Sequence, residues 1–261
     1  MTNGIAPGPT MERIVRALAA GGCVDPEAEA AAIVEAAGEG AGVVDELVAR
    51  RLSGEPLAWI AGGVRFCGLR VRVDPGVFVP RPQTESLARR AVELLPEQGV
   101  AVDLCTGSGA VAAAVRSRRP NATVLGTDLD PAAVACARGN GVDALLGDLD
   151  EPIPSGVRER VDVVTAVVPY VPAEELHFLP RDVLEHEPRH ALDGGPGGTV
   201  VLVRAVGAAG RLLRPGGSVL LELGGEQADE IGSVLAEQGM GETRVLRDQD
   251  GRDRAIEARR G

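Results

Sequence analysis

The sequence contains no lysine, so all 27 of its basic side chains are arginine. This absence removes Schiff-base and lysine-nucleophile mechanisms, which need an ε-amino group. The chain also has no unbroken apolar run long enough to cross a bilayer. Its first residues, MTNGIAPGPTMERIV, lack the basic start and apolar stretch of a secretory signal and are predicted to form a short flexible lead. The expected location is therefore the cytoplasm, without a membrane partner.

Positive charge is also scarce, because the formal net charge is −11 at pH 7. A general nucleic-acid binder needs a positive surface that neutralises phosphates, so this class of partner is not expected. An acidic surface remains compatible with one basic protein or with a small molecule.

Closely spaced cysteine pairs are absent as well. In a cytoplasmic protein, four separated cysteines without a Cys-x-x-Cys motif are expected to be reduced and structural; they are Cys23, Cys67, Cys105 and Cys136. HEPRH at 186–190 matches the His-Glu-x-x-His zinc-protease pattern, but that pattern needs a helix and Pro188 lies in its middle. We therefore predict a surface loop there and no metal site.

The chain begins with a segment of helical pattern. Its 261 residues suffice for one large α/β domain or for one such domain plus a small one. Three short amphipathic helices are predicted within 10–22, 25–38 and 43–54, and the second opens with Asp25 as N-cap and Pro26 as first helical residue. Helices this short suggest a bundle that is stabilised by packing against a larger domain.

A hairpin and a connector are predicted next. Alternation around Gly68 within 63–76 favours a β-hairpin. In the connector GVFVPRPQTESL, Pro80 and Pro82 force extended backbone before a helix that we expect Thr84 to cap. The domain boundary is placed near residue 80.

From residue 97 onward, strand patterns alternate with helix patterns. Five strands are predicted, the fourth over 160–168, and the helix over 198–217 is expected to end at Pro215-Gly216-Gly217. Two closing strands surround an Asp-Gly turn and would place one antiparallel strand in the sheet. The alternation predicts an α/β fold with a doubly wound, mostly parallel sheet.

The stretch VDLCTGSGAV at 102–111 is a candidate ligand-binding turn between a strand and a helix. Glycines let a ligand approach the backbone, and the helix N-terminus offers unpaired donors. The full Gly-x-Gly-x-x-Gly fingerprint is not met, because Cys105 stands at the first glycine position and residue 112 is Ala. A hydride-transfer enzyme is therefore disfavoured.

Three predicted strands end in aspartate, in the order Asp103, Asp128 and Asp148. The carboxyl ends of parallel strands meet at one edge of the sheet, so these carboxylates suit a nucleoside held across that edge. Asp128 is placed to accept from both ribose hydroxyls, and Asp148 from the exocyclic amine of adenine. Because no phosphate-cradling Lys or Arg follows the glycines, S-adenosylmethionine fits best.

These motifs carry a resemblance over nearly the whole chain. GLRVRVDPGVFVPRPQTE, DLCTGSGA, GTDLDPAAVACARGN, EPRHALDGG and the closing GRDRAI are similar to the HemK/PrmC family of S-adenosylmethionine-dependent methyltransferases, which methylate a glutamine side-chain amide in peptide chain release factors. The resemblance implies a seven-stranded, Rossmann-like class I methyltransferase sheet with a small helical N-terminal domain and a linking β-hairpin. The implied division is 1–60 for the helical domain, 61–82 for the hairpin and connector, and 83–261 for the methyltransferase domain.

The resemblance also implies a set of site residues. The methionine end of the cofactor would contact Phe78, Arg81, Pro82, Gln83 and Thr84. The remainder would contact Asp103, Thr106, Gly107, Ser108, Gly109, Asp128, Leu129, Asp148 and Leu149. The catalytic tetrad would be Val167, Val168, Pro169 and Tyr170, and S-adenosylhomocysteine would be the product.

The tetrad is also where the chain departs from the family. The family has Asn-Pro-Pro-Tyr, a related subgroup of unknown substrate has Asn-Val-Pro-Tyr, and here the first residue is Val167. The chain resembles that subgroup most, through Val168. Other departures are Gln83 in place of a Glu, Cys105 in place of a Gly, and Cys67 in place of an aromatic residue.

The missing asparagine bears directly on the substrate. An amide nitrogen is a poor nucleophile, and the family's Asn oxygen with a backbone carbonyl holds the amide NH2 in line with the methyl group. Val167 can supply neither an acceptor nor a donor. Three hypotheses remain: methylation of a protein or peptide amide with altered recognition, methylation of a small-molecule hydroxyl or amine or of a peptide natural product, and cofactor binding without methyl transfer. His177, His186 and His190 follow the tetrad and are expected in loops.

Overall fold

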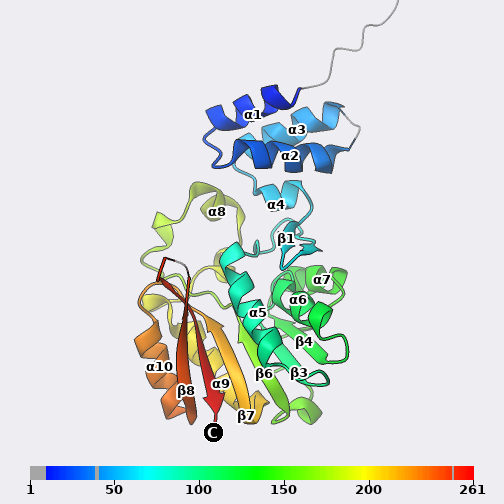
Figure 1. Cartoon of the computed structure of the whole chain (residues 1–261). Coiled ribbons are helices and arrows are strands. Elements are labelled where there is room, and N and C mark those ends of the chain that lie inside the picture. The colour runs from blue at the N-terminus through cyan, green and yellow to red at the C-terminus, as the bar shows by residue number, and fades with distance from the viewer. Residues whose placement is uncertain (1–9, 39–40, 249) are drawn as a thin grey trace, which may run out of the picture.

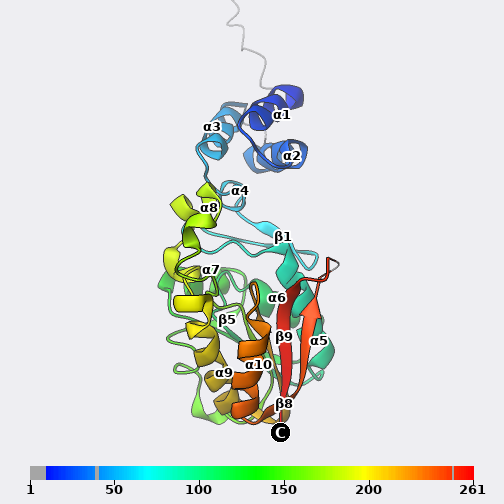
Figure 2. The same ribbon diagram turned by 90° about the vertical axis from the view of Figure 1, so that its left-hand side faces the viewer.

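The computed structural model describes residues 10–38, 41–248 and 250–261. The predicted N-terminal lead falls largely on residues 1–9, outside the described residues. The molecule is elongated, with a group of short helices at one end and a large twisted sheet covered by helices at the other (Figures 1 and 2). No helix in the described ranges combines the length and apolar character that a membrane span requires.

The N-terminal helices form a small bundle with its own core. Their bounds are α1 Met11–Ala20, α2 Pro26–Ala37, α3 Ala41–Leu52 and α4 Leu57–Ile60. The Asp25 carboxylate caps α2 as predicted, accepting from the Ala28 amide at 3.1 Å. The short α4 was not predicted, because four residues are too few to show helical periodicity. Its Trp59 indole donates to the Val77 carbonyl at 3.0 Å and so ties the bundle to the connector.

The hairpin and the connector lead into the sheet domain. Strands β1 Val64–Phe66 and β2 Leu69–Val71 pair antiparallel, and Phe66 and Val71 are buried against α5, Glu85–Leu94. Thr84 occupies the N-cap position of α5, but its hydroxyl makes no capping hydrogen bond. The predicted side-chain cap is wrong because the 3-10 turn Pro82–Thr84 runs straight into α5, so Thr84 already has helical backbone angles.

The sheet has seven strands in the order β5-β4-β3-β6-β7-β9-β8, and β9 alone runs against the others in the described chain. This arrangement confirms the predicted fold class, including the single antiparallel strand. The strands are β3 Val100–Leu104, β4 Thr123–Asp128, β5 Asp143–Leu146, β6 Val161–Ala166, β7 Leu213–Glu222, β8 Met240–Arg247 and β9 Asp253–Arg260.

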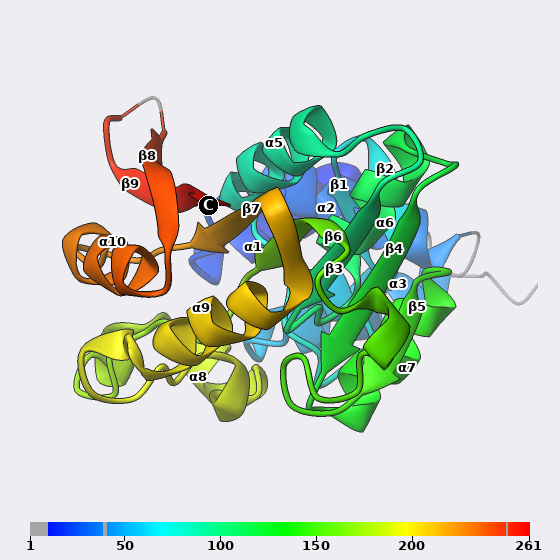
Figure 3. The ribbon, with the colours of Figure 1, turned by 90° about the horizontal axis from the view of Figure 1, so that it is seen from below.

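Helices cover both faces of the sheet (Figure 3). One face packs against α5, α6 Ala110–Arg118 and α7 Pro131–Gly139, and the other against α9 Val200–Leu212 and α10 Ala228–Glu237. The run AVAAAV in α6 is wholly buried, because small side chains allow this helix to lie close to the strands.

Three predicted details of the second half are wrong. Strand β6 ends at Ala166 rather than at residue 168, and α9 ends at Leu212. Pro215 to Gly217 lie within β7 instead of ending the helix. They form an irregularity of this strand, because its register with β6 shifts between the pairs Val161–Leu213 and Val163–Ser218.

The stretch 186–190 is not a plain surface loop either. A helix that was not predicted, α8 Arg181–His186, ends there, and the following Glu187 is buried. Pro188 stops this helix, so the two histidines do not share a helix face. In the described chain, no cluster of three or more His, Cys, Asp or Glu has the arrangement of a metal site.

Candidate active site

Three adjoining cavities open at the carboxyl ends of β3, β4, β5 and β6, and Phe78 and Val167 line all three. The first, of about 160 Å³, lies over β4 and β5. The second, of about 40 Å³, lies over the glycine turn, and the third, of about 360 Å³, lies beside the tetrad. We call them the β4–β5 cavity, the turn cavity and the tetrad cavity.

The glycine turn after β3 shapes the wall between the first two cavities. Gly107 has φ +56°, and a Cβ built on it would meet no atom within 4 Å, so its backbone faces open space. A Cβ on Gly109 would come within 3.0 Å of Ala137 and Val142, so this glycine is needed for packing and lines none of the three cavities. Cys105 holds φ +54°, a conformation that favours the glycine it replaces.

Asp128, at the end of β4, lines the β4–β5 cavity and organises the turn beside it. Its Oδ2 accepts from the Gly107 amide at 2.8 Å, and its Oδ1 accepts from the Asp130 amide at 3.0 Å. Burial raises the pKa of this carboxyl, and the two backbone amides act in the opposite direction. Each oxygen keeps a second lone pair, so the carboxylate can still receive two hydroxyl donors.

Asp103, at the end of β3, is buried under the turn cavity. The Thr106 hydroxyl donates to its Oδ2 at 2.6 Å, and the Thr165 hydroxyl donates to its Oδ1 at 2.7 Å. Burial raises its pKa to about 6, although both hydroxyls favour the ionised form. Above this pKa the carboxylate places a negative charge beneath the turn cavity, and the groups that act on it include two hydroxyls and a backbone amide but no cation.

Replacing Asp103 with Asn is expected to stabilise the chain more at pH 8 than at pH 5. Because the folded pKa of about 6 lies above the ordinary 3.8, the folded state holds the proton more tightly. The stability linked to that proton is complete below about pH 4 and is lost as the pH rises through 6, by at most ~3 kcal/mol. Urea unfolding of wild type and variant at the two pH values measures the difference in their free energies of unfolding. An equal difference at pH 5 and pH 8 would contradict the prediction.

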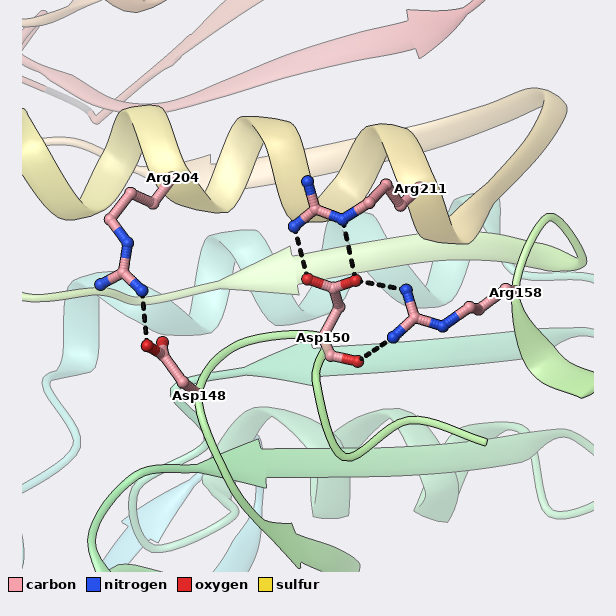
Figure 4. A network of polar contacts seen from close by, with 5 residues as sticks. All are labelled: Asp148, Asp150, Arg158, Arg204 and Arg211. Atoms are coloured by element: carbon pink, nitrogen blue, oxygen red, sulfur yellow. Dashed lines mark hydrogen bonds and ion pairs between the residues drawn. The ribbon is translucent and has the colours of Figure 1, made fainter. Parts of the chain in front are cut away.

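Asp148 does not end β5 as predicted but lies two residues beyond its last residue, Leu146, and it lines the β4–β5 cavity together with Leu149. One of its oxygens is already engaged, because the Arg204 guanidinium of α9 donates to Oδ2 at 2.5 Å (Figure 4). Its Oδ1 has no hydrogen-bond partner among the described residues and stays available for the predicted contact with an adenine amine. Leu149 is buried in the core below, with φ +47°, and fixes the bend of the loop.

The tetrad lies where the three cavities meet. Val167 is half-buried and faces the cavities, whereas Val168 is buried in the core. The Tyr170 hydroxyl donates to Glu222 Oε1 at 3.0 Å, and burial raises the pKa of both groups. The Gln227 amide donates to the Tyr170 carbonyl at 2.9 Å, so β7 and the start of α10 hold the turn on both sides.

The connector residues divide between the cavities. Thr84 lines the turn cavity, whereas Arg81 and Gln83 line the tetrad cavity and Pro82 lines a separate groove against the N-terminal helices. Arg81 lies over the Phe78 ring at 4.8 Å and donates to Glu187 Oε1 at 2.6 Å. Arg81 and Gln83 were expected at the methionine end of the cofactor, but in the structure they line the same cavity as the tetrad.

Several functional candidates were missed from the sequence. Glu222 ends the apolar strand SVLLELG and is a further carboxylate at a strand end, a signal that could have been found. Arg204 had no sequence signal, because its partner Asp148 is brought to it only by the fold. His190 also lines the β4–β5 cavity and lies 3.2 Å from Asp130 Oδ2, whereas His177 and His186 line none of the three cavities.

Comparison with curated proteins finds extensive similarity to "Release factor glutamine methyltransferase" from several bacteria. The chain is 36% identical to that of Geobacter sulfurreducens, with 82% of this chain and 77% of the relative covered. It is 40% identical to that of Bordetella pertussis over 80% of this chain and 79% of the relative. It is 35% identical to that of Moorella thermoacetica over 94% and 95%. No protein-family model matches the chain.

Solved structures share the fold at lower sequence identity. A methyltransferase from Pyrococcus furiosus aligns with a TM-score of 0.54 and 22% identity, covering 74% of this chain and 90% of that one. A 16S rRNA N2 methyltransferase from T. thermophilus, in complex with AdoMet and guanosine, aligns with a TM-score of 0.52 and 20% identity, covering 76% and 44%.

Proposed function

We propose, from the premise that this chain belongs to the release factor glutamine methyltransferase family, that it methylates a side-chain amide of a protein substrate with altered recognition at Val167. Family membership makes the chain an S-adenosylmethionine-dependent methyltransferase. The identity of the substrate goes beyond family membership and is the part that we propose. A glutamine of a release factor is the first candidate, because the relatives are described by that activity. The observation that carries the altered recognition is that Val167, which has no polar side-chain atom, lines both the β4–β5 cavity and the tetrad cavity.

The residues around the β4–β5 and turn cavities fit a nucleoside cofactor. The open space in front of Gly107 admits a ligand to the backbone, Asp128 keeps free lone pairs for two ribose hydroxyls, and Asp148 keeps one free oxygen for a base. The anionic floor at Asp103 suits a ligand that carries a positive charge. Bound S-adenosylmethionine would supply an activated methyl group there. We propose that Phe78 and Thr84 contact its methionine end, with Thr106, Ser108 and Leu129 completing the site.

The tetrad cavity would hold the acceptor in place. Its polar lining is sparse: Arg81 is committed to Glu187, and the Tyr170 hydroxyl is committed to Glu222. Gln83 has no side-chain hydrogen bond among the described residues, which leaves its amide free to serve a substrate. A primary amide both donates and accepts, so Gln83 can pair with a substrate amide in the complementary sense. We propose that Gln83 supplies the polar contact that Val167 lacks.

Replacing Gln83 with Ala is expected to lower kcat/KM for an amide substrate by about 10-fold or more, because one positioned hydrogen bond is lost. Gln83→Glu restores the residue that the family carries at this position and keeps an acceptor for the substrate NH2, so it should be less impaired than Gln83→Ala. Adding Val167→Asn to Gln83→Ala should restore activity if the two side chains fill one role. Steady-state kinetics of the three variants check this; an unchanged Gln83→Ala enzyme contradicts it.

A second acceptor class is favoured by the apolar character of the same cavity. Most of its lining is apolar, with Val171, Leu179, Val183 and Leu192 around the tetrad. A small molecule or a peptide natural product with a more reactive hydroxyl or amine would not need the family's asparagine. In the described chain, no histidine lines the tetrad cavity to serve as a base for such a substrate.

The deciding experiment incubates the purified chain with S-adenosylmethionine and a recombinant release factor, and locates any added methyl group by mass spectrometry. Methylation of one glutamine supports the amide proposal. If the release factor stays unmodified while a host extract yields a small molecule or a peptide natural product methylated on a hydroxyl or amine, the second acceptor class is correct. Calorimetry with S-adenosylhomocysteine runs in parallel, since absent binding would show that the cofactor site has been assigned wrongly.

We further propose that the chain is divided into a helical domain (1–60), a hairpin and connector (61–82) and a methyltransferase domain (83–261). The family resemblance implies this division, and the separate core of the N-terminal helices supports it. The groove between α2, the hairpin and α8 has a volume of about 490 Å³ and would accommodate part of a protein partner. The subgroup with Val at the second tetrad position remains the proposed place of this chain in its family, and the cytoplasm its proposed location.

A further inference from the structure

We propose that Arg204 reads the adenine ring of the cofactor together with Asp148, so that the pair selects the base. This inference rests on the proposed placement of the nucleoside in the β4–β5 cavity. Arg204 lies on α9, and both members of the pair line that cavity. The ligand recognised is a purine edge that presents an amine donor beside a ring-nitrogen acceptor.

The neighbouring ion pair shows what a purely structural arginine does here (Figure 4). Arg211 donates to both oxygens of Asp150, at 2.6 and 3.0 Å, and Arg158 donates to Oδ2 and to the backbone carbonyl at 2.6 and 2.7 Å. Asp150 is 4% exposed and does not line the cavity. Its hydrogen-bonding capacity is used within the protein, and it fastens the loop after β5 to α9.

The Arg204–Asp148 pair is open by comparison. One contact joins the side chains, from Nη2 to Oδ2, and they are 52% and 32% exposed. Among the described residues, Oδ1 of Asp148 and the Nε and Nη1 groups of Arg204 have no partner. The cavity edge therefore offers a carboxylate acceptor next to guanidinium donors.

This order of groups is complementary to adenine. Adenine presents an amine donor flanked by ring-nitrogen acceptors, so Asp148 can accept from the amine while Arg204 donates to N1. Hypoxanthine, which has a carbonyl in place of the amine and a protonated N1, would set an acceptor against Asp148 and a donor against Arg204. The same pair would thus reject a deaminated cofactor.

Arg204 is held in position by the rest of α9. Arg211 lies seven residues further along, on the same side of the helix, and its bond to Asp150 fixes the loop that carries Asp148. Leu202, Val206 and Ala209 bury the opposite side of α9 against the sheet. Arg204 therefore acts from a rigid helix rather than from a mobile loop.

The test is calorimetric titration of the full chain with S-adenosylhomocysteine and with its deaminated analogue S-inosylhomocysteine. We expect wild type to prefer the adenosyl ligand by about 10²-fold, and Arg204→Ala to reduce that preference about 10-fold by weakening the adenosyl ligand alone. Arg204→Lys retains the charge without the planar fork and should fall between the two. Arg214→Ala, which removes the ion pair of a similarly exposed arginine with Asp162 on β6, should leave the preference unchanged.

The outcomes distinguish a failure of the role proposed for Arg204 from a failure of the proposed cofactor site. If Arg204→Ala weakens both ligands equally, or weakens neither, Arg204 does not read the base and this inference fails while the cofactor site stands. If wild type binds neither ligand, the cofactor site itself has been placed wrongly. Melting temperatures of the variants show whether any loss of binding comes from unfolding.

Discussion

Replacing Asp128 with Ala is expected to lower the affinity for S-adenosylhomocysteine by about 10²-fold or more. Two hydroxyls that donate to a carboxylate are lost, and each such bond contributes ~1.5–3 kcal/mol. The Gly107 and Asp130 amides also lose their acceptor, so the turn at the cavity wall loosens. Calorimetry measures the affinity, and circular dichroism shows whether the fold persists.

A matched pair of controls makes this result specific. Asp128→Asn keeps the shape and one acceptor oxygen, so its loss should be intermediate. Asp162 also accepts from a backbone amide, that of Val100 at 2.8 Å, but it lies near the amino ends of the strands. Asp162→Ala should therefore cost stability without changing the affinity. An Asp128→Ala protein that binds like wild type would show that the ribose is held elsewhere.

Replacing Val167 with Asn is expected to raise methylation of a glutamine-containing peptide by about 10²-fold, the size of effect that one positioned polar group has on a rate. The residue is half-buried and faces the cavities, so an Asn side chain can reach a substrate without being sealed in the core. Its amide oxygen would accept from the substrate NH2 and hold the nitrogen in line for attack. Peptide methylation with labelled S-adenosylmethionine measures the gain.

The control places the same side chain elsewhere in the cavity. Val171 lines the tetrad cavity but not the other two, so Val171→Asn adds polarity without serving the reacting nitrogen. No gain is expected there. If Val167→Asn loses activity on the native substrate and no glutamine methylation appears, the acceptor is not an amide.

The cofactor side of the site was largely predictable, because its signals are local in sequence. Asp128 is the last residue of β4 and Asp103 the penultimate residue of β3, and the carboxyl ends of parallel strands lie at one edge of the sheet. Gly107 was predictable for a similar reason, since a strand-to-helix turn at a ligand requires φ values that a side chain opposes.

The contacts between distant segments were not predictable. Arg204 meets Asp148 across 56 residues, and Tyr170 meets Glu222 across 52, through helix and sheet packing that a single sequence does not display. The same holds for Arg81, whose partner Glu187 lies in a stretch that was predicted as a plain surface loop. Pairing of this kind is a property of tertiary structure, and periodicity carries no trace of it.

Phe78 and Val167 have a further consequence, because they wall both the cofactor side and the acceptor side of the site. Any change in the volume of either side chain alters the space for two ligands at once. Substitutions there should move the Michaelis constants for donor and acceptor together, whereas substitutions at Gln83 should move the acceptor's alone. A new acceptor specificity can therefore evolve more readily through residues that line the tetrad cavity alone than through Phe78 and Val167. A substitution at either of these two residues that improves binding of one ligand also changes the space for the other.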